Sequence, residues 1–385
     1  MLLAGGRGGA RAPDQPRVVQ LQISRPRVAL PRRSEPLEFV VALHVEGTPV
    51  TWQRNATLAR DDEQRMLEAV DGLRRWSGGV GLTRPQAAAS VVDLGRTLRD
   101  VFLGPKGRRL LADLDRTALL LMVDETVLHL PWEMMFDTDN APMVLAPFGR
   151  VVTTRVSPPT GRDLSTEDPT VRILAVENPT DDLAASERVM DVIHGLRPAN
   201  PDLEIEVTTL AKGDATRRRF TETVVAGDFD IVHFAGHGRF DGDHPSDSAV
   251  VLADGLLTDE HVLKLRWKQP PFVVWNSSCE SARVGPATRI VSNTRRSNGL
   301  ASAFLSRGVE AYLGHYFFVE DTSAAEFSET FYTTLLRERN VGRAVQEARQ
   351  RAIDRFAGEC DLTGLGAVFF GDAGTAQRRD LATAS

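Results

Sequence analysis

The sequence predicts an α/β protein with a mostly parallel sheet and helices on both faces, preceded by a smaller α/β unit. From residue 170 onward, apolar strand-like runs alternate with helical patterns, as they do in a parallel sheet covered on both sides. Residues 35–156 also mix strand and helix patterns. A Pro-, Ser- and Asp-rich stretch at 157–169 separates the two regions and is typical of a linker.

Length and composition are those of a packed globular chain. The 385 residues suit two or three domains, and 42% apolar with 25% charged residues is ordinary for such a protein. Seven arginines against one aspartate in residues 1–33 favour a solvated basic tail. We therefore expect the following division: a disordered tail over 1–34, an α/β unit over 35–156, a linker over 157–169, a larger unit over 170–373 and a disordered tail over 374–385.

The elements of the first unit follow from hydrophobic periodicity. Residues 37–47 (LEFVVALHVEG) predict a strand, and 61–76 and 87–102 predict amphipathic helices. Residues 117–135 (TALLLMVDETVLHLPWEMM) predict an apolar strand, an acidic turn and a second apolar segment broken by Pro131.

The elements of the second unit alternate between the two periodicities. The predicted strands before the midpoint are 171–178 and 203–210, with helices at 183–196 and 216–226, and two further strands run up to His237 and Cys279. After these come a short helix at 299–306 and a strand at 309–319. Ser323 and Glu326 predict a capping box for the next helix. A final helix from Val341 and a strand in 366–372 close the chain.

The most informative residues are His237 in IVHFAGHG and Cys279 in VVWNSSCES. Each follows an apolar run, so both are expected just past the carboxyl ends of neighbouring strands. A free thiol of pKa ~8.5 is a poor nucleophile at neutral pH, and an adjacent imidazole activates it and later protonates the leaving amine. This pattern predicts a cysteine hydrolase with His237 as base and Cys279 as nucleophile.

Residues around this pair have predicted supporting roles. Backbone N–H groups of Gly238 and Cys279 are the expected oxyanion hole, since glycines beside the histidine allow a sharp turn. His233, inside the strand, is expected to support the site by hydrogen bonding, while Asn276 and Ser278 are expected to position the cysteine loop.

HFAGHG together with NSSCESA resembles the CHAT proteases, the caspase-fold branch that is also similar to separase and the caspases. Caspases place the histidine ~50 residues before the cysteine, and the spacing here is compatible. NPTDDLAASE, NGLASAFLSRGVEAYLG, FFVEDTSAAEFSETFYTTLL and VGRAVQEARQRA follow the order of elements of that family. DETVLHLPWEMM resembles its preceding half, a catalytically silent caspase-like unit that packs on the active one. The resemblance covers residues 170–372 well and 35–372 loosely.

The resemblance implies a cysteine endopeptidase with a caspase-like fold that cleaves a specific protein. It places Asp182 and Asp321 at the pocket for the residue before the cut, where aspartate favours Arg or Lys by ion pairing. It also suggests a substrate encoded nearby, such as a gasdermin-like or other bacterial defence effector, and an activating partner. Two departures stand out: no tetratricopeptide array is visible, and Phe317 and Phe318 stand where the family has a tryptophan.

The composition of the chain indicates its cellular compartment and the classes of partner that it excludes. Two cysteines favour a reducing cytoplasm over a disulfide framework. The apolar runs fall short of the ~20 residues that cross a bilayer, and the first residues lack the apolar stretch of a signal peptide. A net charge of -6 argues against a nucleic-acid partner. We therefore expect a cytoplasmic protein without a membrane span.

Three alternatives compete with the peptidase. A metal hydrolase would use His233, His237, Asp241, Asp243 and His244, but their spacing matches neither HExxH nor HxHxDH. A serine hydrolase lacks a GxSxG elbow, and GGRGGAR and GPKGRR lack the context of a phosphate loop. A catalytically silent caspase-like scaffold that recruits partners is the alternative from another class. We expect no cofactor and no metal. The arginine-rich loop at 282–299 is either a gate or a surface loop.

Overall fold

The computed structural model describes residues 17–26, 35–111, 117–123, 127–135, 146–152, 170–240, 248–283, 299–356 and 358–374. The elements of the N-terminal part are β1 (Arg17–Ser24), β2 (Leu37–Val45), β3 (Thr51–Leu58), α1 (Arg60–Ser77), α2 (Arg84–Phe102), α3 (Gly104–Leu111), β4 (Thr117–Val123), the 3-10 helix η2 (Trp132–Met134) and β5 (Phe148–Val152). Those of the C-terminal part are β6 (Thr170–Glu177), α4 (Ala185–Ala199), β7 (Glu204–Ala211), the 3-10 helix η4 (Lys212–Asp214), α5 (Arg217–Ala226), β8 (Ile231–Ala235), β9 (Gly238–Arg239), β10 (Ala249–Leu252), β11 (Gly255–Thr258), α6 (Asp259–Leu263), β12 (Val273–Asn276), α7 (Leu300–Ser306), β13 (Ala311–His315), α8 (Asp321–Glu338), α9 (Val341–Phe356), α10 (Thr363–Gly366) and β14 (Ala367–Phe370).

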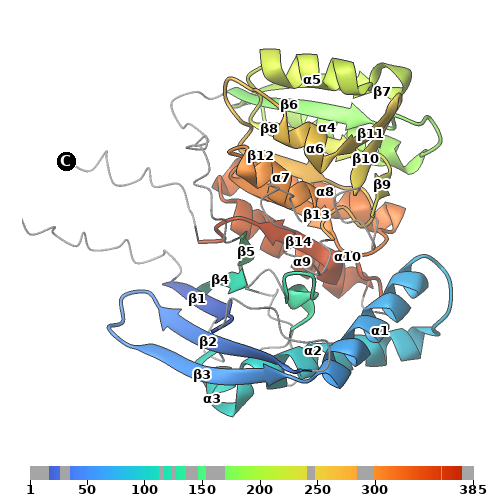
Figure 1. Ribbon diagram of the computed structural model, residues 1–385. Helices are drawn as coiled ribbons and strands as arrows, with labels where there is room; N and C mark the ends of the chain where they lie inside the picture. Colours follow the sequence, from blue (N-terminus) through green and yellow to red (C-terminus); the bar gives the residue numbers. More distant parts are fainter. Residues whose placement is uncertain are drawn as a thin grey trace, which may run out of the picture.

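One sheet runs through both parts of the molecule. Eleven of the described strands pair in the order β3-β2-β1-β4-β5-β14-β13-β12-β8-β6-β7, and β9, β10 and β11 form a separate small sheet. β5 and β14 pair in parallel at the junction, with Arg150 opposite Phe370. Figure 1 shows the blue and teal N-terminal strands continuing the sheet below the orange, yellow and green ones. The two parts therefore join edge to edge.

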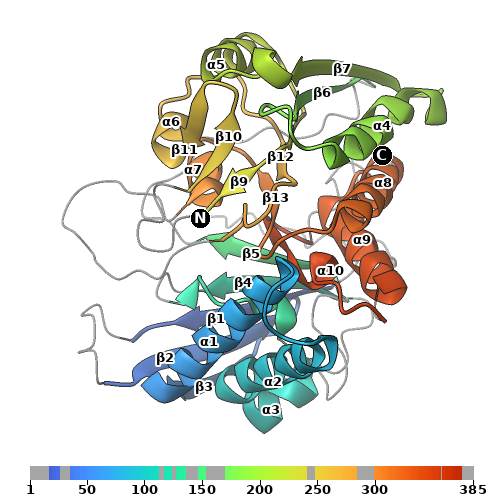
Figure 2. The same ribbon diagram turned by 90° about the vertical axis from the view of Figure 1, so that its right-hand side faces the viewer.

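Helices cover both faces of the C-terminal part of the sheet, which confirms the predicted fold class. α4, α8 and α9 pack on one face, where Ile193, Phe331 and Ala348 belong to one buried cluster with the strands. α5, α6 and α7 cover the other face through Phe220, Val262 and Phe304, which belong to a second cluster. Figure 2 shows these two groups of helices on opposite sides of the strands.

The C-terminal strands that carry the candidate site are parallel. β7, β6, β8, β12 and β13 all run in the same direction, and β14 turns antiparallel to β13. Every residue of IVHFA in β8 and of VVWN in β12 is buried, which is expected of strands covered on both faces. The carboxyl ends of β6, β8 and β12 consequently meet at one edge of the sheet.

The expectation of a disordered tail through residue 34 is wrong for residues 17–24. This segment is β1, which pairs with β2 on one side and β4 on the other. Val19, Leu21 and Ile23 are buried, while the glutamines between them are exposed. The alternation is an ordinary strand signal, and the arginine content around it obscured it. The other predicted tail residues, apart from 25, 26 and 374, and the linker 157–169 lie outside the described residues.

Two buried arginines strengthen the junction between the parts. Arg349 on α9 donates to the Phe148 carbonyl of β5 at 3.0 Å and to the Ala367 carbonyl of β14 at 2.7 Å. Arg150 on β5 pairs with the buried Glu133 carboxylate. A buried charge is tolerated only when it is paired and hydrogen-bonded. Arg349 therefore ties β5 to β14, and Arg150, which is paired within the N-terminal part, reaches β14 through its guanidinium, 5.6 Å from the centre of the Phe370 ring.

Candidate active site

His237 and Cys279 lie at the same edge of the sheet. β8 and β12 are adjacent and parallel, with Phe234 opposite Asn276 at their carboxyl ends. His237 follows β8 after one intervening residue, and Cys279 follows β12 after two. The loops that carry these side chains therefore leave neighbouring strands in the same direction, as predicted.

Glycines allow close contact between the loops at this edge. A Cβ atom on Gly238 would collide with the carbonyl oxygen of Cys279 and lie 3.0 Å from Ser278 Cβ. A Cβ on Gly236 would lie 2.9 Å from Cδ of Pro179, in the turn after β6. Only a residue without a side chain fits at either position without displacing its neighbour. The backbone around the histidine is thus pressed against both the cysteine loop (residues 277–283) and the turn after β6.

Asp182 holds the imidazole. Its Oδ1 lies 3.1 Å from His237 Nε2, and the two side chains are 65% and 43% exposed. The Thr180 hydroxyl, which donates to the same carboxylate, and secondarily His237 hold the pKa of Asp182 below its usual value. Asp182 is therefore an anion at neutral pH. The family resemblance placed Asp182 at the substrate pocket, and its contact with His237 was not predicted.

The turn that presents Asp182 is fixed by its own backbone. Asn178 has a left-handed φ of 39° and its N–H donates to the Ala235 carbonyl of β8 at 2.8 Å. Its side-chain Oδ1 accepts the Leu183 N–H at 3.1 Å. Asparagine is one of the few residues that adopt this conformation readily. The aspartate thereby reaches the histidine from a turn anchored to the histidine's own strand.

The Cys279 thiol lies in a half-buried position. Its Sγ accepts the backbone N–H of Val319 at 3.5 Å. Burial, and then the carboxylates of Glu280 and Asp321, raise the pKa of the thiol, while the Val319 N–H acts in the opposite direction. The thiol is thus protonated at neutral pH. A base must remove its proton before it can attack an electrophile.

The negative charge of Asp321 is near enough to affect the pKa of the Cys279 thiol. Asp321 is not the N-cap of α8. The N-cap of α8 is Glu320, whose side chain accepts the N–H groups of Thr322 and Ser323. The predicted capping box of Ser323 and Glu326 is therefore wrong, because the helix begins one residue after Glu320. Asp321 occupies the first helical position, is exposed, and contributes negative charge next to the thiol.

His233 is buried, and both of its ring nitrogens make hydrogen bonds inside the fold. Its Nδ1 lies 2.8 Å from the Tyr332 hydroxyl and its Nε2 lies 3.1 Å from Ser277 Oγ. Ser277 Oγ donates its proton to the Phe234 carbonyl, so Nε2 of the histidine is the donor and Nδ1 the acceptor. Burial lowers the pKa of His233 to about 3. The ring stays neutral and, through Ser277, holds the start of the cysteine loop.

Asn276 and Ser278 belong to the turn that leads from β12 to Cys279. Asn276 Oδ1 accepts the Ser278 N–H at 3.2 Å, and the Asn276 carbonyl accepts the Ser281 hydroxyl at 2.7 Å. The Ser278 hydroxyl is buried and makes no hydrogen bond within the described part of the chain. The asparagine closes the turn that carries Cys279.

Sequence reasoning missed Val319, Ser277 and Arg283. Arg283 pairs with Glu280, and its guanidinium lies 4.1 Å from the centre of the Phe240 ring. It thereby ties the cysteine loop to the loop after His237 by a cation–π contact. Ser277 lies within the NSSCES motif, so its position two residues before Cys279 could have marked it as a candidate site residue. Val319 acts through its backbone, which no side-chain pattern reveals.

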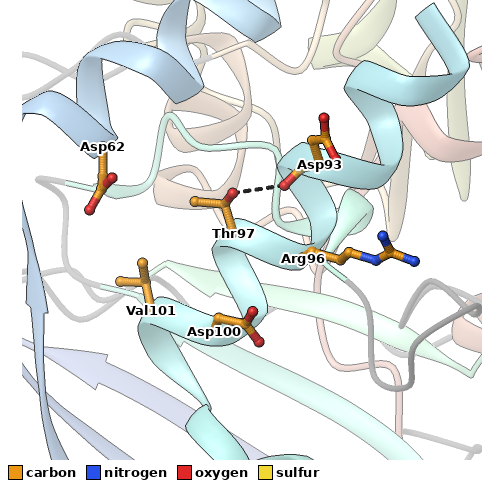
Figure 3. Close-up of a pocket in the computed structure, with 6 residues that line it drawn as sticks. All are labelled: Asp62, Asp93, Arg96, Thr97, Asp100 and Val101. Carbon is orange, nitrogen blue, oxygen red and sulfur yellow. Dashed lines mark hydrogen bonds between the residues drawn. The ribbon is translucent and has the colours of Figure 1, made fainter.

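Other candidate sites do not coincide with this edge. His244, Asp241 and Asp243 of the metal alternative lie outside the described residues, and within the described ranges no group of three His, Cys, Asp or Glu side chains is arranged to hold a metal. Figure 3 shows a hollow between α1 and α2. It is lined by Asp62, Asp93, Arg96, Thr97, Asp100 and Val101. None of the helices that could be searched is long and apolar enough to cross a membrane.

The fold of the chain is similar to that of solved structures. The fold is similar to two crystal structures of the separase–securin complex of Saccharomyces cerevisiae, with TM-scores of 0.57 and 0.56 at 11% sequence identity. Each match covers 92% of this chain and 30% of the matched chain, so this chain spans less than a third of the length of the chain that it matches. The complex of the pro- and mature domains of Porphyromonas gingivalis RgpB has a TM-score of 0.47 at 12% identity, covering 83% of this chain and 78% of that one.

The sequence comparison gives the family. No curated protein matches the sequence. Residues 92–359 match the family described as the CHAT domain, a range that runs from α2 past α9 and includes both His237 and Cys279. Because this match covers more than half of the chain, the chain belongs to the CHAT domain family, and its caspase-like fold is similar to that of separase.

Proposed function

We propose that the protein is a cysteine endopeptidase in which His237 and Cys279 form the catalytic pair. The observation that carries the proposal is the packing of Gly238 against the cysteine loop while Asp182 holds the imidazole from the other side. The imidazole of His237, the thiol of Cys279 and the carboxylate of Asp182 thus lie at one edge of the sheet, which supports their assignment as base, nucleophile and orienting group. This is the arrangement that activates a nucleophile.

The reaction follows from these positions. His237 takes the proton of Cys279. Because Nε2 of His237 is hydrogen-bonded to Asp182, the ring nitrogen that accepts this proton is Nδ1. The thiolate attacks the peptide carbonyl carbon, and the backbone N–H groups of Gly238 and Cys279 stabilise the oxyanion, each by roughly 3 kcal/mol. His237 then gives the proton to the departing amine. Water hydrolyses the resulting thioester, returning the thiol and releasing the new carboxylate.

The charge around the thiol supports a preference for Arg or Lys before the cleaved bond. Asp321 lies near Cys279 and is exposed, so it suits an ion pair with a basic substrate side chain. Asp182 adds negative charge on the histidine side. A peptide library cleaved mainly after aspartate or apolar residues would refute this preference.

The proposed substrate is a protein of the same cell, in the cytoplasm. A gasdermin-like or other defence effector encoded nearby, and an activating partner, are hypotheses that rest on family resemblance. Mass spectrometry of candidate proteins incubated with wild type and with Cys279→Ala tests them, since cleavage products should form only with the intact thiol.

The test of the catalytic pair uses the second cysteine as a matched control. A peptide electrophile with arginine before its reactive group should label wild type and Cys360→Ala equally and Cys279→Ala not at all. Cys360 is also a free, partly exposed thiol, so it reports nonspecific alkylation. Labelling that persists in Cys279→Ala would show that the assignment is wrong.

One observation favours the scaffold alternative. The raised pKa of Cys279 leaves the resting thiol neutral, as in a structural cysteine. A scaffold would show slow labelling that does not depend on the histidine. The peptidase requires that His237→Ala abolish rapid labelling.

A further inference from the structure

The residues that follow β13 lie between the cysteine loop and the N-terminal part of the molecule. On one side, the Phe317 carbonyl accepts the Glu280 N–H at 3.2 Å and the Val319 N–H donates to Cys279 Sγ at 3.5 Å. On the other side, the Phe318 N–H donates to Ser77 Oγ at 3.3 Å. We call residues 316–319 the bridging segment. Along this segment, the backbone groups of Phe317 and Val319 contact the cysteine loop, and that of Phe318 contacts the N-terminal part.

The N-terminal contact comes from the carboxyl end of α1. Ser77 Oγ donates to the Arg74 carbonyl at 2.9 Å, which orients its lone pairs for the Phe318 N–H. A Cβ on Gly78 would lie 3.3 Å from two carbons of the Phe318 ring, closer than most such contacts. The ring is therefore packed directly over Gly78.

The end of α1 has a fixed conformation. The Val80 N–H donates to the Arg75 carbonyl at 2.9 Å and the Gly79 N–H to the Trp76 carbonyl at 2.8 Å, and Gly79 has a left-handed φ of 84°. This is a Schellman motif, which stops a helix in one defined geometry. Ser77 and Gly78 thus form a rigid support rather than a frayed end.

A second contact supports the same segment. The Tyr316 hydroxyl donates to the His129 carbonyl of the N-terminal part at 2.5 Å. The Arg283 guanidinium of the cysteine loop lies 5.8 Å from the Tyr316 ring centre. Both ends of the bridging segment are therefore held between the N-terminal part and the cysteine loop.

We propose that Ser77 and Gly78 are positioning residues of the active site: by holding Phe318, they keep the Val319 N–H directed at Cys279 Sγ. The N-terminal part, which contributes none of the proposed reacting groups, thereby sets the environment of the nucleophile. This inference rests on the proposed role of Cys279. It predicts that a change at the end of α1 alters the reactivity of a thiol that α1 does not contact.

The test measures alkylation of Cys279 by iodoacetamide as a function of pH, in a Cys360→Ala background so that one thiol reacts. Ser77→Ala removes the acceptor of the Phe318 N–H, and Gly78→Val displaces the Phe318 ring. Both should slow alkylation at pH 7 by roughly three- to tenfold, the scale of one hydrogen bond to a thiolate, and move the profile to higher pH.

Two variants serve as controls. Ser77→Thr keeps the hydroxyl and should retain the wild-type profile. Gly72→Ala lies on the same helix, where its Cβ makes an ordinary 3.6 Å contact with Leu82, and it should also leave the profile unchanged. A purely structural role of Ser77 would lower the melting temperature without moving the pH profile.

An unchanged profile in Ser77→Ala overturns the inference, and this variant decides alone if Gly78→Val does not fold. Because alkylation needs no peptide, the test is separate from catalysis. A Ser77-dependent profile in a protein that cleaves no peptide would uphold the positioning role and refute the proposed peptidase.

Discussion

Asp182 and Asp321 approach the reacting pair from different sides. Asp182 makes a direct hydrogen bond with the imidazole of His237, whereas Asp321 acts on Cys279 through its charge alone. A carboxylate that orients a base affects the chemical step, and a carboxylate that meets the substrate affects binding. The two aspartates should therefore have different kinetic signatures.

Asp182→Asn should lower kcat by about 10- to 100-fold with little change in KM, because a misoriented imidazole transfers the proton less efficiently. Asp321→Asn should instead raise KM about fivefold for substrates with Arg or Lys before the cut, the scale of an exposed ion pair. Steady-state kinetics on one arginine-containing peptide measures both. Equal changes in KM for the two variants would assign both aspartates to the pocket.

His233→Ala and His237→Ala should separate stability from activity. Loss of the buried His233 ring leaves a cavity and removes a hydrogen-bond partner from Tyr332, which should lower the free energy of unfolding by roughly 2–5 kcal/mol. His237 is partly exposed, so its removal should leave the melting temperature unchanged and abolish peptide cleavage. Urea denaturation and a cleavage assay of both variants test the contrast.

At this scale, the sequence was sufficient for the positions of these residues in the fold and insufficient for their contacts. The places of His237, Cys279 and His233 were predictable because each lies in or just after an apolar strand. The hydrogen bond that Asp182 accepts from His237 depends on the left-handed turn at Asn178, and the one that Val319 donates to Cys279 depends on a backbone amide. Neither conformation leaves a residue-type pattern that sequence reasoning can detect.

At the scale of elements, the start of β9 is the most constrained point of the site. Gly238→Ala should drive the histidine loop and the cysteine loop apart, because its Cβ would collide with the Cys279 carbonyl oxygen. We expect activity to fall at least 100-fold and stability to fall by about 1–3 kcal/mol, as for overpacked positions. Gly195→Ala, whose Cβ meets no atom within 4 Å, is the matched control in the same assays.

Elements with an unambiguous pattern were predicted, and those with competing signals were not. β8 and β12 were predictable as short, mostly apolar runs. β1 was missed because its Val19, Leu21 and Ile23 alternation lies among arginines, and composition outweighed periodicity. The start of α8 was displaced because Glu320 and Ser323 both resemble caps, and only the observed hydrogen bonds distinguish them.

At the scale of the whole molecule, three buried histidines make the fold sensitive to acid. Burial lowers the pKa of His129 to about 4 and those of His233 and His315 to about 3, from an ordinary 6.5. The unfolded chain binds these protons below pH 6.5 and the folded chain does not, so stability is lost as pH falls from 6.5 toward 3. At pH 5 the loss is about 2 kcal/mol per histidine.

Urea midpoints at pH 7.5, 6 and 5 measure this loss. His315→Leu removes one of the three groups and should reduce the fall. A midpoint independent of pH in this range would show that the buried rings are protonated without cost.

The shared sheet predicts that the C-terminal part does not stand alone. Residues 170–374 expressed without the rest would leave β14 as an exposed edge and Arg349 without its Phe148 acceptor. An apolar open edge favours association between chains. We expect aggregates in size-exclusion chromatography and recovery of a soluble complex on co-expression with residues 1–152. A soluble, active monomer of 170–374 would contradict this.

The position of β14 in the sheet also determines when the two parts of the molecule can assemble during synthesis. A ribosome makes roughly 5–20 residues per second, so β14 emerges about ten to forty seconds after β5, with which it pairs. During that interval β5 has an unpaired edge, and β13 provides a second one only shortly before β14 is made. β14 is the strand that enters between them. The N-terminal part can therefore join the sheet that carries the thiol only after β14 has been synthesised.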